Sequence, residues 1–303
     1  MRALAWFVGL ILLGLASIAV FTYPLWTVLH PHFDFPFHRL GERIGMLVLL
    51  IAVVAASRRL GLNDRTSLGY GIARRTFLRE MSLGLALGVA TMAMVVALMT
   101  ALGLLDWTAA AGLGAAGLAK LVALRLSSGL AVAFIEETFL RGAMLTAMER
   151  EAGAATAVLA TAVVYSATHF FASHRIAAAD VTARSGLDLL EGTLHLFAHP
   201  GSIADAFLCL FAVGVVLGMV RIQTGNIAAC IGLHAGWVWV MLVVHDVSQP
   251  LRDAPLGFLL SRFDGFVGWL VLAWTILLGF ALQRLYATCA NKSSRATGSS
   301  ISR

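Results

Sequence analysis

Long apolar runs separated by short polar stretches dominate the chain. A transmembrane helix needs about 20 consecutive apolar residues. Eight runs meet or approach this length, at residues 3–29, 41–57, 80–105, 118–147, 154–172, 203–222, 226–245 and 263–285. The pattern predicts an all-α fold, a polytopic transmembrane helix bundle of about eight helices in a single integral membrane domain over residues 1–303.

The basic residues between the runs predict the orientation. The strongest basic cluster follows the second run and comprises Arg58, Arg59, Arg65, Arg74, Arg75 and Arg79. Arginine and lysine in short loops mark the cytoplasmic side. The first run is too long for a signal peptide, so we expect it to be retained as a helix. Both termini are then predicted to be cytoplasmic.

Composition supports a lipid environment. Hydrophobic residues make up 59 % of the chain and charged residues 13 %, and the mean hydropathy is +0.86. A soluble domain carries about a quarter charged residues. The net charge of +6 resides in the loops, so nucleic acid is not an expected partner. Arginine far outnumbers lysine, which favours a bacterial inner (cell) membrane.

Two polar stretches lie outside the runs. We expect residues 289–303 to form a disordered polar tail. The loop from about 173 to 202 is interpreted as solvated, with a metal site as the alternative because it carries His174, His195, His199, Asp180, Asp188 and Glu191. The three cysteines, Cys209, Cys230 and Cys289, form no CxxC pair, so we interpret them as packing residues.

Charged residues interrupt the fourth run. It contains Glu136, Glu137 and Arg141, and each charge near the bilayer centre costs about 2.5–3.5 kcal/mol on insertion scales. Glu137 and Arg141 are four residues apart and can pair on one helix face. Glu136 is turned by about 100° from Glu137 and has no partner in its own helix. It needs a partner from another helix, or a raised pKa suited to a general base.

Two histidines on other runs are candidate partners. His169 lies in the fifth run and His234 in the seventh. The fourth and fifth runs form a predicted hairpin, and at 1.5 Å per residue Glu136 and His169 lie at depths that agree to within about one turn. Each group also has a purely structural interpretation, as an ion pair or an interhelical hydrogen bond. Their ordered occurrence on three helices favours a catalytic site.

These residues resemble the motifs of the CPBP intramembrane proteases, which include CAAX prenyl endoproteases and relatives linked to bacteriocin processing or immunity. Glu136-Glu137-x-x-x-Arg141 is similar to the family's EExxxR motif. Tyr165-x-x-x-His169 is similar to its FxxxH motif, with Tyr in place of Phe. His234, which follows Thr224-Gly225-Asn226, is similar to its third motif. The resemblance covers residues 118–246, the expected catalytic core.

One position departs from the family pattern. The third motif is often HxxxN, but position 238 is Val238. In the family that Asn is thought to hold the site or stabilise the oxyanion. Trp237, Trp239 and Thr168 are candidate substitute donors, and the sequence does not choose among them.

The resemblance implies an intramembrane endopeptidase that acts on a membrane-associated protein or peptide within the lipid bilayer. Glu136, assisted by His169, would activate water. His234 would stabilise the oxyanion, and Glu137 and Arg141 would orient Glu136. A glutamic mechanism requires no cofactor. If zinc is bound instead, Glu136, His169 and His234 are the expected ligands.

Two other functions fit the same residues. A non-catalytic immunity or scaffold protein could retain the fold, and Val238 favours that reading slightly. A proton-coupled transporter could use intramembrane Glu and His residues as a relay. No repeated halves or Pro-broken helices at matched positions are evident in the sequence, which weighs against a transporter.

Overall fold

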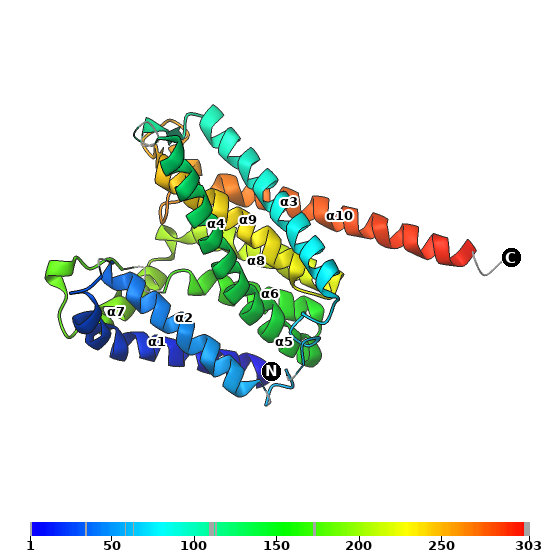
Figure 1. Ribbon diagram of the computed structural model, residues 1–303, viewed down its shortest axis with the longest axis horizontal. Helices are drawn as coiled ribbons and strands as arrows, with labels where there is room; N and C mark the ends of the chain where they lie inside the picture. The colour runs from blue at the N-terminus through cyan, green and yellow to red at the C-terminus, as the bar shows by residue number, and fades with distance from the viewer. Residues whose placement is uncertain are drawn as a thin grey trace.

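The computed structural model is almost entirely helical, which confirms the predicted all-α fold (Figure 1). The structure describes residues 2–299 except 34, 58, 63, 109–111, 113, 172 and 173, and describes side chains only up to residue 288. Arg58 of the basic cluster therefore lies outside the described residues. The α-helices are α1 (Arg2–Leu29), α2 (Phe37–Ala56), α3 (Arg74–Ala101), α4 (Ala115–Glu137), α5 (Leu145–Ala152), α6 (Ala154–Thr168), α7 (Ser185–Ala198), α8 (Ala204–Thr224), α9 (Ala228–Val247) and α10 (Trp269–Ser299).

Short elements connect these helices. A π-helix (Thr138–Met144) joins α4 to α5, and 3₁₀ turns lie at Ala178–Asp180, Pro200–Ser202 and Gly257–Leu259. The strands β1 (Leu105–Asp106) and β2 (Gln249–Pro250) pair antiparallel and tie the end of α3 to the end of α9. α10 extends to Ser299, past residue 289, and the disorder of the tail stays a prediction.

Six of the described helical segments are long and apolar enough to cross a membrane. They are Arg2–Leu29, Arg74–Ala101, Ala115–Ala152, Ala204–Thr224, Ala228–Val247 and Trp269–Thr288. The protein is therefore an integral membrane protein, but the predicted count of eight spans is not confirmed. α6 has 15 residues, a length of about 22 Å against a hydrocarbon core of about 30 Å. α2 carries Arg39, Glu42 and Arg43 near its start.

α1 and α2 form a hairpin that packs side by side (Figure 1). The stretch that the sequence analysis interpreted as a solvated loop contains helix α7, and this helix packs against α1. Leu189 of α7 is fully buried in a cluster with Ile18 and Trp26 of α1. The interpretation as a wholly solvated loop is therefore wrong, because an apolar face of α7 covers α1.

Glycines bring α3 and α9 into close contact at the centre of the bundle. A Cβ atom at Gly232 would lie 2.0 Å from the carbonyl oxygen of Met81, and one at Gly88 would lie 2.4 Å from that of Leu233. Gly84 and Gly236 are equally tight, at 2.5 Å and 2.7 Å from backbone oxygens. Small residues four apart allow membrane helices to approach closely. This packing fixes the position of the α9 segment that carries His234.

A tight turn sets the start of α9. Gly225 ends α8 in the left-handed conformation, with φ of 68°. Asn226 follows, buried, and its Oδ1 accepts a hydrogen bond from the Ala228 N–H at 2.9 Å. Its Nδ2 donates to Glu80 Oε2 of α3 at 2.9 Å. One amide side chain thus caps α9 and joins the α8–α9 turn to α3.

Candidate active site

The candidate site begins where the helix of the fourth apolar run changes its geometry. Residues Ala115–Ala152 form one continuous helical stretch of 38 residues. Within it, α4 ends at Glu137 and the π-helix begins at Thr138. π-helical turns inside α-helices are rare and occur frequently at functional sites. Glu136 and Glu137 are therefore the last two residues before a local widening of the helix.

Glu137 is the centre of a buried polar cluster. Its Oε1 accepts a hydrogen bond from Arg141 Nη1 at 2.9 Å and lies 2.9 Å from His234 Nδ1. The side chains of Glu137 and Arg141 are both fully buried. A buried charge is tolerated when it is paired and hydrogen bonded, which both partners here achieve. The predicted Glu137–Arg141 pair is confirmed as a contact.

Arg141 makes two further contacts that hold this cluster together. Its Nη2 donates to the Gly214 carbonyl of α8 at 3.2 Å. Its guanidinium carbon lies 4.7 Å from the centre of the Tyr165 ring, a cation–π geometry. The arginine therefore connects three helical segments, since Glu137 ends α4, Gly214 belongs to α8 and Tyr165 to α6.

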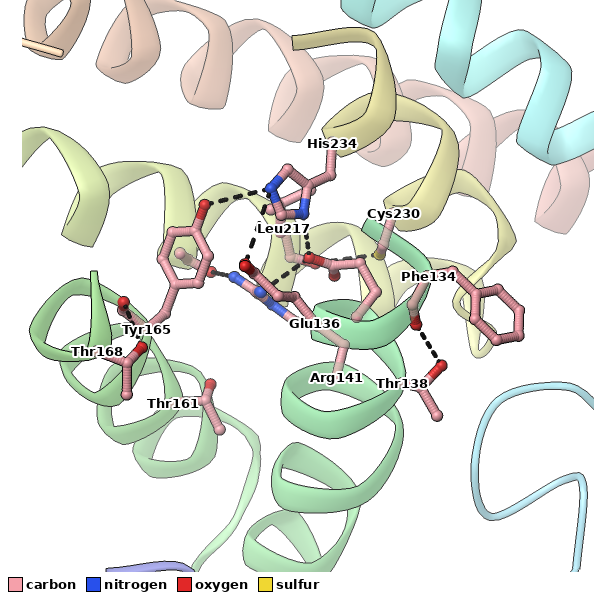
Figure 2. Close-up of polar contacts among 12 residues, drawn as sticks. Phe134, Glu136, Thr138, Arg141, Thr161, Tyr165, Thr168, Leu217, Cys230 and His234 are labelled. Carbon is pink, nitrogen blue, oxygen red and sulfur yellow. Dashed lines mark hydrogen bonds and ion pairs between the residues drawn. The ribbon is translucent and has the colours of Figure 1, made fainter. Parts of the chain in front are cut away.

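Glu136 lies next to the other ring nitrogen of His234 and makes no ion pair with Arg141 among the described residues. Its side chain is 24 % exposed, and its Oε2 lies 4.0 Å from His234 Nε2. Within the described part of the chain, that oxygen has no hydrogen-bond partner. Figure 2 shows Glu136, Tyr165 and His234 directed toward one another from three helices. Glu136 thus has a buried carboxylate oxygen that the described residues leave unpaired beside His234.

The contacts of Glu137 and Arg141 differ from the role that the sequence predicted. They were expected to orient Glu136, but their hydrogen bonds hold His234 and α8 instead. A carboxylate that accepts from Nδ1 fixes the tautomer and the ring orientation of a histidine. The consequence is that His234 presents Nε2 to Glu136 and Tyr165.

His169 lies one residue beyond the end of α6. The predicted helical run continued to residue 172, but α6 ends at Thr168. His169 Nδ1 lies 2.8 Å from the Tyr165 carbonyl oxygen, and its ring contacts the Tyr165 ring edge-on at 4.5 Å. Because Nδ1–H donates to that carbonyl, Nε2 is the basic nitrogen. No direct contact joins His169 to Glu136 or His234 among the described residues.

A large cavity unites these side chains. It has a volume of about 920 Å³ and is lined by residues of the α1–α2 hairpin and of α3, α4, α6, α8, α9 and α10. Glu136, Tyr165, His169 and His234 all line it, and most of its wall is apolar. Apolar pockets with a few convergent polar groups are typical of ligand and substrate sites.

The residues proposed to replace the absent Asn are already engaged. Val238 lines the cavity and offers no donor. Trp237 Nε1 donates to Thr91 Oγ1 at 3.0 Å, and Trp239 Nε1 donates to the Val122 carbonyl at 2.9 Å. Thr168 Oγ1 donates to the Tyr165 carbonyl at 3.0 Å. Each of the three would have to break a hydrogen bond to serve.

The donor set does not fit a metal ion as it is placed. Among the described residues, no group of three or more His, Cys, Asp or Glu side chains is arranged to hold one. This applies both to Glu136, His169 and His234 and to the histidines of the stretch around α7. Near the latter, Asp188 and Glu191 pair with Arg184.

The comparison with the FxxxH motif gave no role to the hydroxyl group of Tyr165. The sequence analysis treated Tyr in place of Phe as a change in an aromatic packing residue. In the structure the hydroxyl lies 3.5 Å from His234 Nε2. The sequence did contain an indication of this contact: Tyr165 lies in an apolar run, and a buried tyrosine hydroxyl usually finds a polar partner.

Comparison with known families agrees with this geometry. Residues 118–240 match the family model described as type II CAAX prenyl endopeptidase Rce1-like. No curated protein and no solved structure matched the chain. The matched segment contains all five site residues and extends from α4 to the middle of α9. Residues 118–240 therefore carry an Rce1-like core of the CPBP family, a family of CAAX-type intramembrane proteases.

Proposed function

We propose that the protein is an active intramembrane endopeptidase that hydrolyses a peptide bond with a water molecule activated by Glu136. One observation carries this proposal: the Glu136 side chain lines the cavity, and its Oε2 has no hydrogen-bond partner among the described residues and lies 4.0 Å from His234 Nε2. Glu137 Oε2 is also unpaired among the described residues, but Glu137 does not line the cavity and its other oxygen is bound to Arg141 and His234.

The chemistry follows from the positions of these groups. Glu136 accepts a proton from water, and the hydroxide oxygen bonds to the substrate carbonyl carbon. His169 lines the same cavity, and its Nε2 would assist the base through the bound water, because no direct contact joins the two side chains among the described residues. The tetrahedral intermediate then loses its amine as the C–N bond breaks, and the proton held by Glu136 passes to that amine. No step requires an oxidant or a reductant.

His234 is assigned to the oxyanion. Glu137 holds the ring through Nδ1, so Nε2 faces Glu136 and Tyr165, and a protonated Nε2 would donate to the oxyanion. Arg141 holds Glu137 in place through the hydrogen bond from its Nη1. Glu137 and Arg141 are therefore positioning residues that act through His234.

The substrate class follows from the cavity. Its wall is largely apolar and is shared by helices from both halves of the chain. The matched family description names a prenyl endopeptidase. We propose that this protein cleaves a membrane-anchored protein or peptide, with an apolar or lipid-modified portion in the cavity and the scissile bond at Glu136.

The test compares the termini of membrane proteins from cells that express wild type or Glu136→Gln. Glu149→Gln is the matched control, because it makes the same change on the same continuous helix outside the cavity. We expect new termini with wild type and Glu149→Gln and none with Glu136→Gln. Identical termini in all three, at equal abundance of folded protein, would contradict the proposal.

A further inference from the structure

Tyr165 places a hydroxyl group next to the reacting groups. The side chain comes from α6, is 2 % exposed, and its hydroxyl lies 3.5 Å from His234 Nε2 (Figure 2). The Tyr165 and His234 rings meet edge-on with centroids 5.9 Å apart. The hydroxyl is therefore on the same side of the cavity as the Glu136 carboxylate, which lies 4.0 Å from the same nitrogen.

The Tyr165 ring is held rigidly while its hydroxyl is held weakly. Arg141 lies over one face of the ring at 4.7 Å, and His169 contacts its edge at 4.5 Å. By contrast, 3.5 Å is long for a hydroxyl hydrogen bond, which is usually about 2.7–2.8 Å between heavy atoms. Rotation about the C–O bond can therefore redirect the proton to a stronger acceptor without moving the ring.

An oxyanion is such an acceptor. Hydrogen bonds to a charged oxygen are shorter and roughly twice as strong as neutral ones. A donor that is fixed before the reaction contributes most, since it needs no reorganisation when the charge develops. The Tyr165 ring is fixed in this way, so only its O–H bond has to turn, whereas Trp237 and Thr168 are committed to other acceptors.

We propose that the Tyr165 hydroxyl is the second oxyanion donor of this site, acting beside His234 where Val238 supplies no donor. This inference rests on the proposed function. As the hydroxide oxygen adds to the substrate carbonyl, the carbonyl oxygen becomes negative and accepts hydrogen bonds from the Tyr165 O–H and from His234 Nε2–H. Both protons stay on their donors, and the bonds are released when the C–N bond breaks.

The test measures kcat and KM for Tyr165→Phe on the substrate that the termini comparison identifies. We expect kcat to fall about 10²–10³-fold, the usual loss for one oxyanion donor, with KM unchanged. Tyr23→Phe, on α1, is the matched control and should keep wild-type kcat. Trp274→Phe tests a competing donor, because Trp274 lines the cavity and its Nε1 has no partner among the described residues.

Adding a new donor near the site shows whether a loss of kcat in Tyr165→Phe comes from the missing hydroxyl or from altered packing. Val238→Asn in the Tyr165→Phe background should recover kcat at least about tenfold, by the same donor energetics, and should gain little in the wild-type background. Should Tyr165→Phe fail to fold, fluorotyrosine incorporated at position 165 keeps the ring and alters the acidity of the hydroxyl. A changed kcat for that protein would support the proposal, and an unchanged one would overturn it.

A failure of the proposed role of Tyr165 can be distinguished from a failure of the proposed protease function. Full kcat in Tyr165→Phe together with no cleavage by Glu136→Gln overturns the role of Tyr165 alone. A loss of kcat in Trp274→Phe alone assigns the donor to Trp274 and also overturns the role of Tyr165. Cleavage that is equal in wild type and Glu136→Gln overturns both proposals.

Discussion

Glu137 Oε1 lies 2.9 Å from both Arg141 Nη1 and His234 Nδ1, although Glu137 and His234 are 97 positions apart in the chain. One oxygen thus serves the structural ion pair and the orientation of a candidate catalytic histidine.

The effects of Glu137 and Arg141 on the free energy of unfolding should be strongly coupled. Removing one partner leaves an uncompensated buried charge, which costs about 3–5 kcal/mol. We expect Glu137→Gln and Arg141→Gln each to unfold at markedly lower temperature than wild type in the same detergent. The double variant should be less destabilised than the sum of the two, by about 0.5–3 kcal/mol of coupling. Additive losses in this cycle would argue against a coupled pair.

Gly232 should tolerate no side chain. Gly232→Ala places a Cβ atom 2.0 Å from the Met81 carbonyl oxygen, so α3 and α9 must separate. We expect a loss of about 1–3 kcal/mol, the usual cost of overpacking. Gly9→Ala on α1 is the control, because nothing lies within 4 Å of that position. Equal thermal stability of the two variants would show that the glycine contact is unimportant.

Asn226 should require an amide rather than a carboxylate. Asn226→Asp sets a second carboxylate against Glu80 Oε2, which now accepts from Asn226 Nδ2 at 2.9 Å. We expect earlier exposure of the buried Cys209 and Cys230 thiols to a thiol-reactive dye on heating. Glu80→Gln should restore stability in this background, because the repulsion is removed. Absence of that rescue would show that repulsion from Glu80 is not the cause of the loss.

Chelation should leave cleavage intact. The proposed mechanism derives its base from Glu136 and its oxyanion donors from His234 and Tyr165, with no step through a metal. We expect the purified protein to keep its kcat after dialysis against a strong chelator and to show no gain on adding zinc. Loss of activity that zinc restores would replace the glutamic mechanism with a metal-dependent one.

The orientation follows from the arginine-rich segment after α2. Arg59, Arg65, Arg74, Arg75 and Arg79 are expected to stay in the cytoplasm. A fluorescent protein fused after residue 303 should therefore fluoresce in a bacterial host, because both termini are predicted to lie on that side. Alkaline phosphatase fused after Trp107 should be active, because the α3–α4 connection is predicted to face outward. An inactive phosphatase fusion would reverse the predicted topology.

The sequence alone determined the features that depend on neighbours along the chain. Long apolar runs require helices in lipid, because backbone polar groups must be satisfied within the segment. The spacing of Glu137 and Arg141 places them on one helix face, so their pairing was predictable. The two histidines were recognisable as candidates because polar groups at bilayer depth are costly.

The tertiary structure decided every feature that depends on how helices cross. The contact between Glu137 and His234 is set by the approach of α4 to α9, where a Cβ atom at Gly129 of α4 would lie 3.0 Å from the carbonyl oxygen of Ala235. The same packing turns the Tyr165 hydroxyl toward His234 and leaves a Glu136 oxygen unpaired at the cavity. Local periodicity fixes the face on which a side chain lies, whereas only the packed bundle fixes what that face meets.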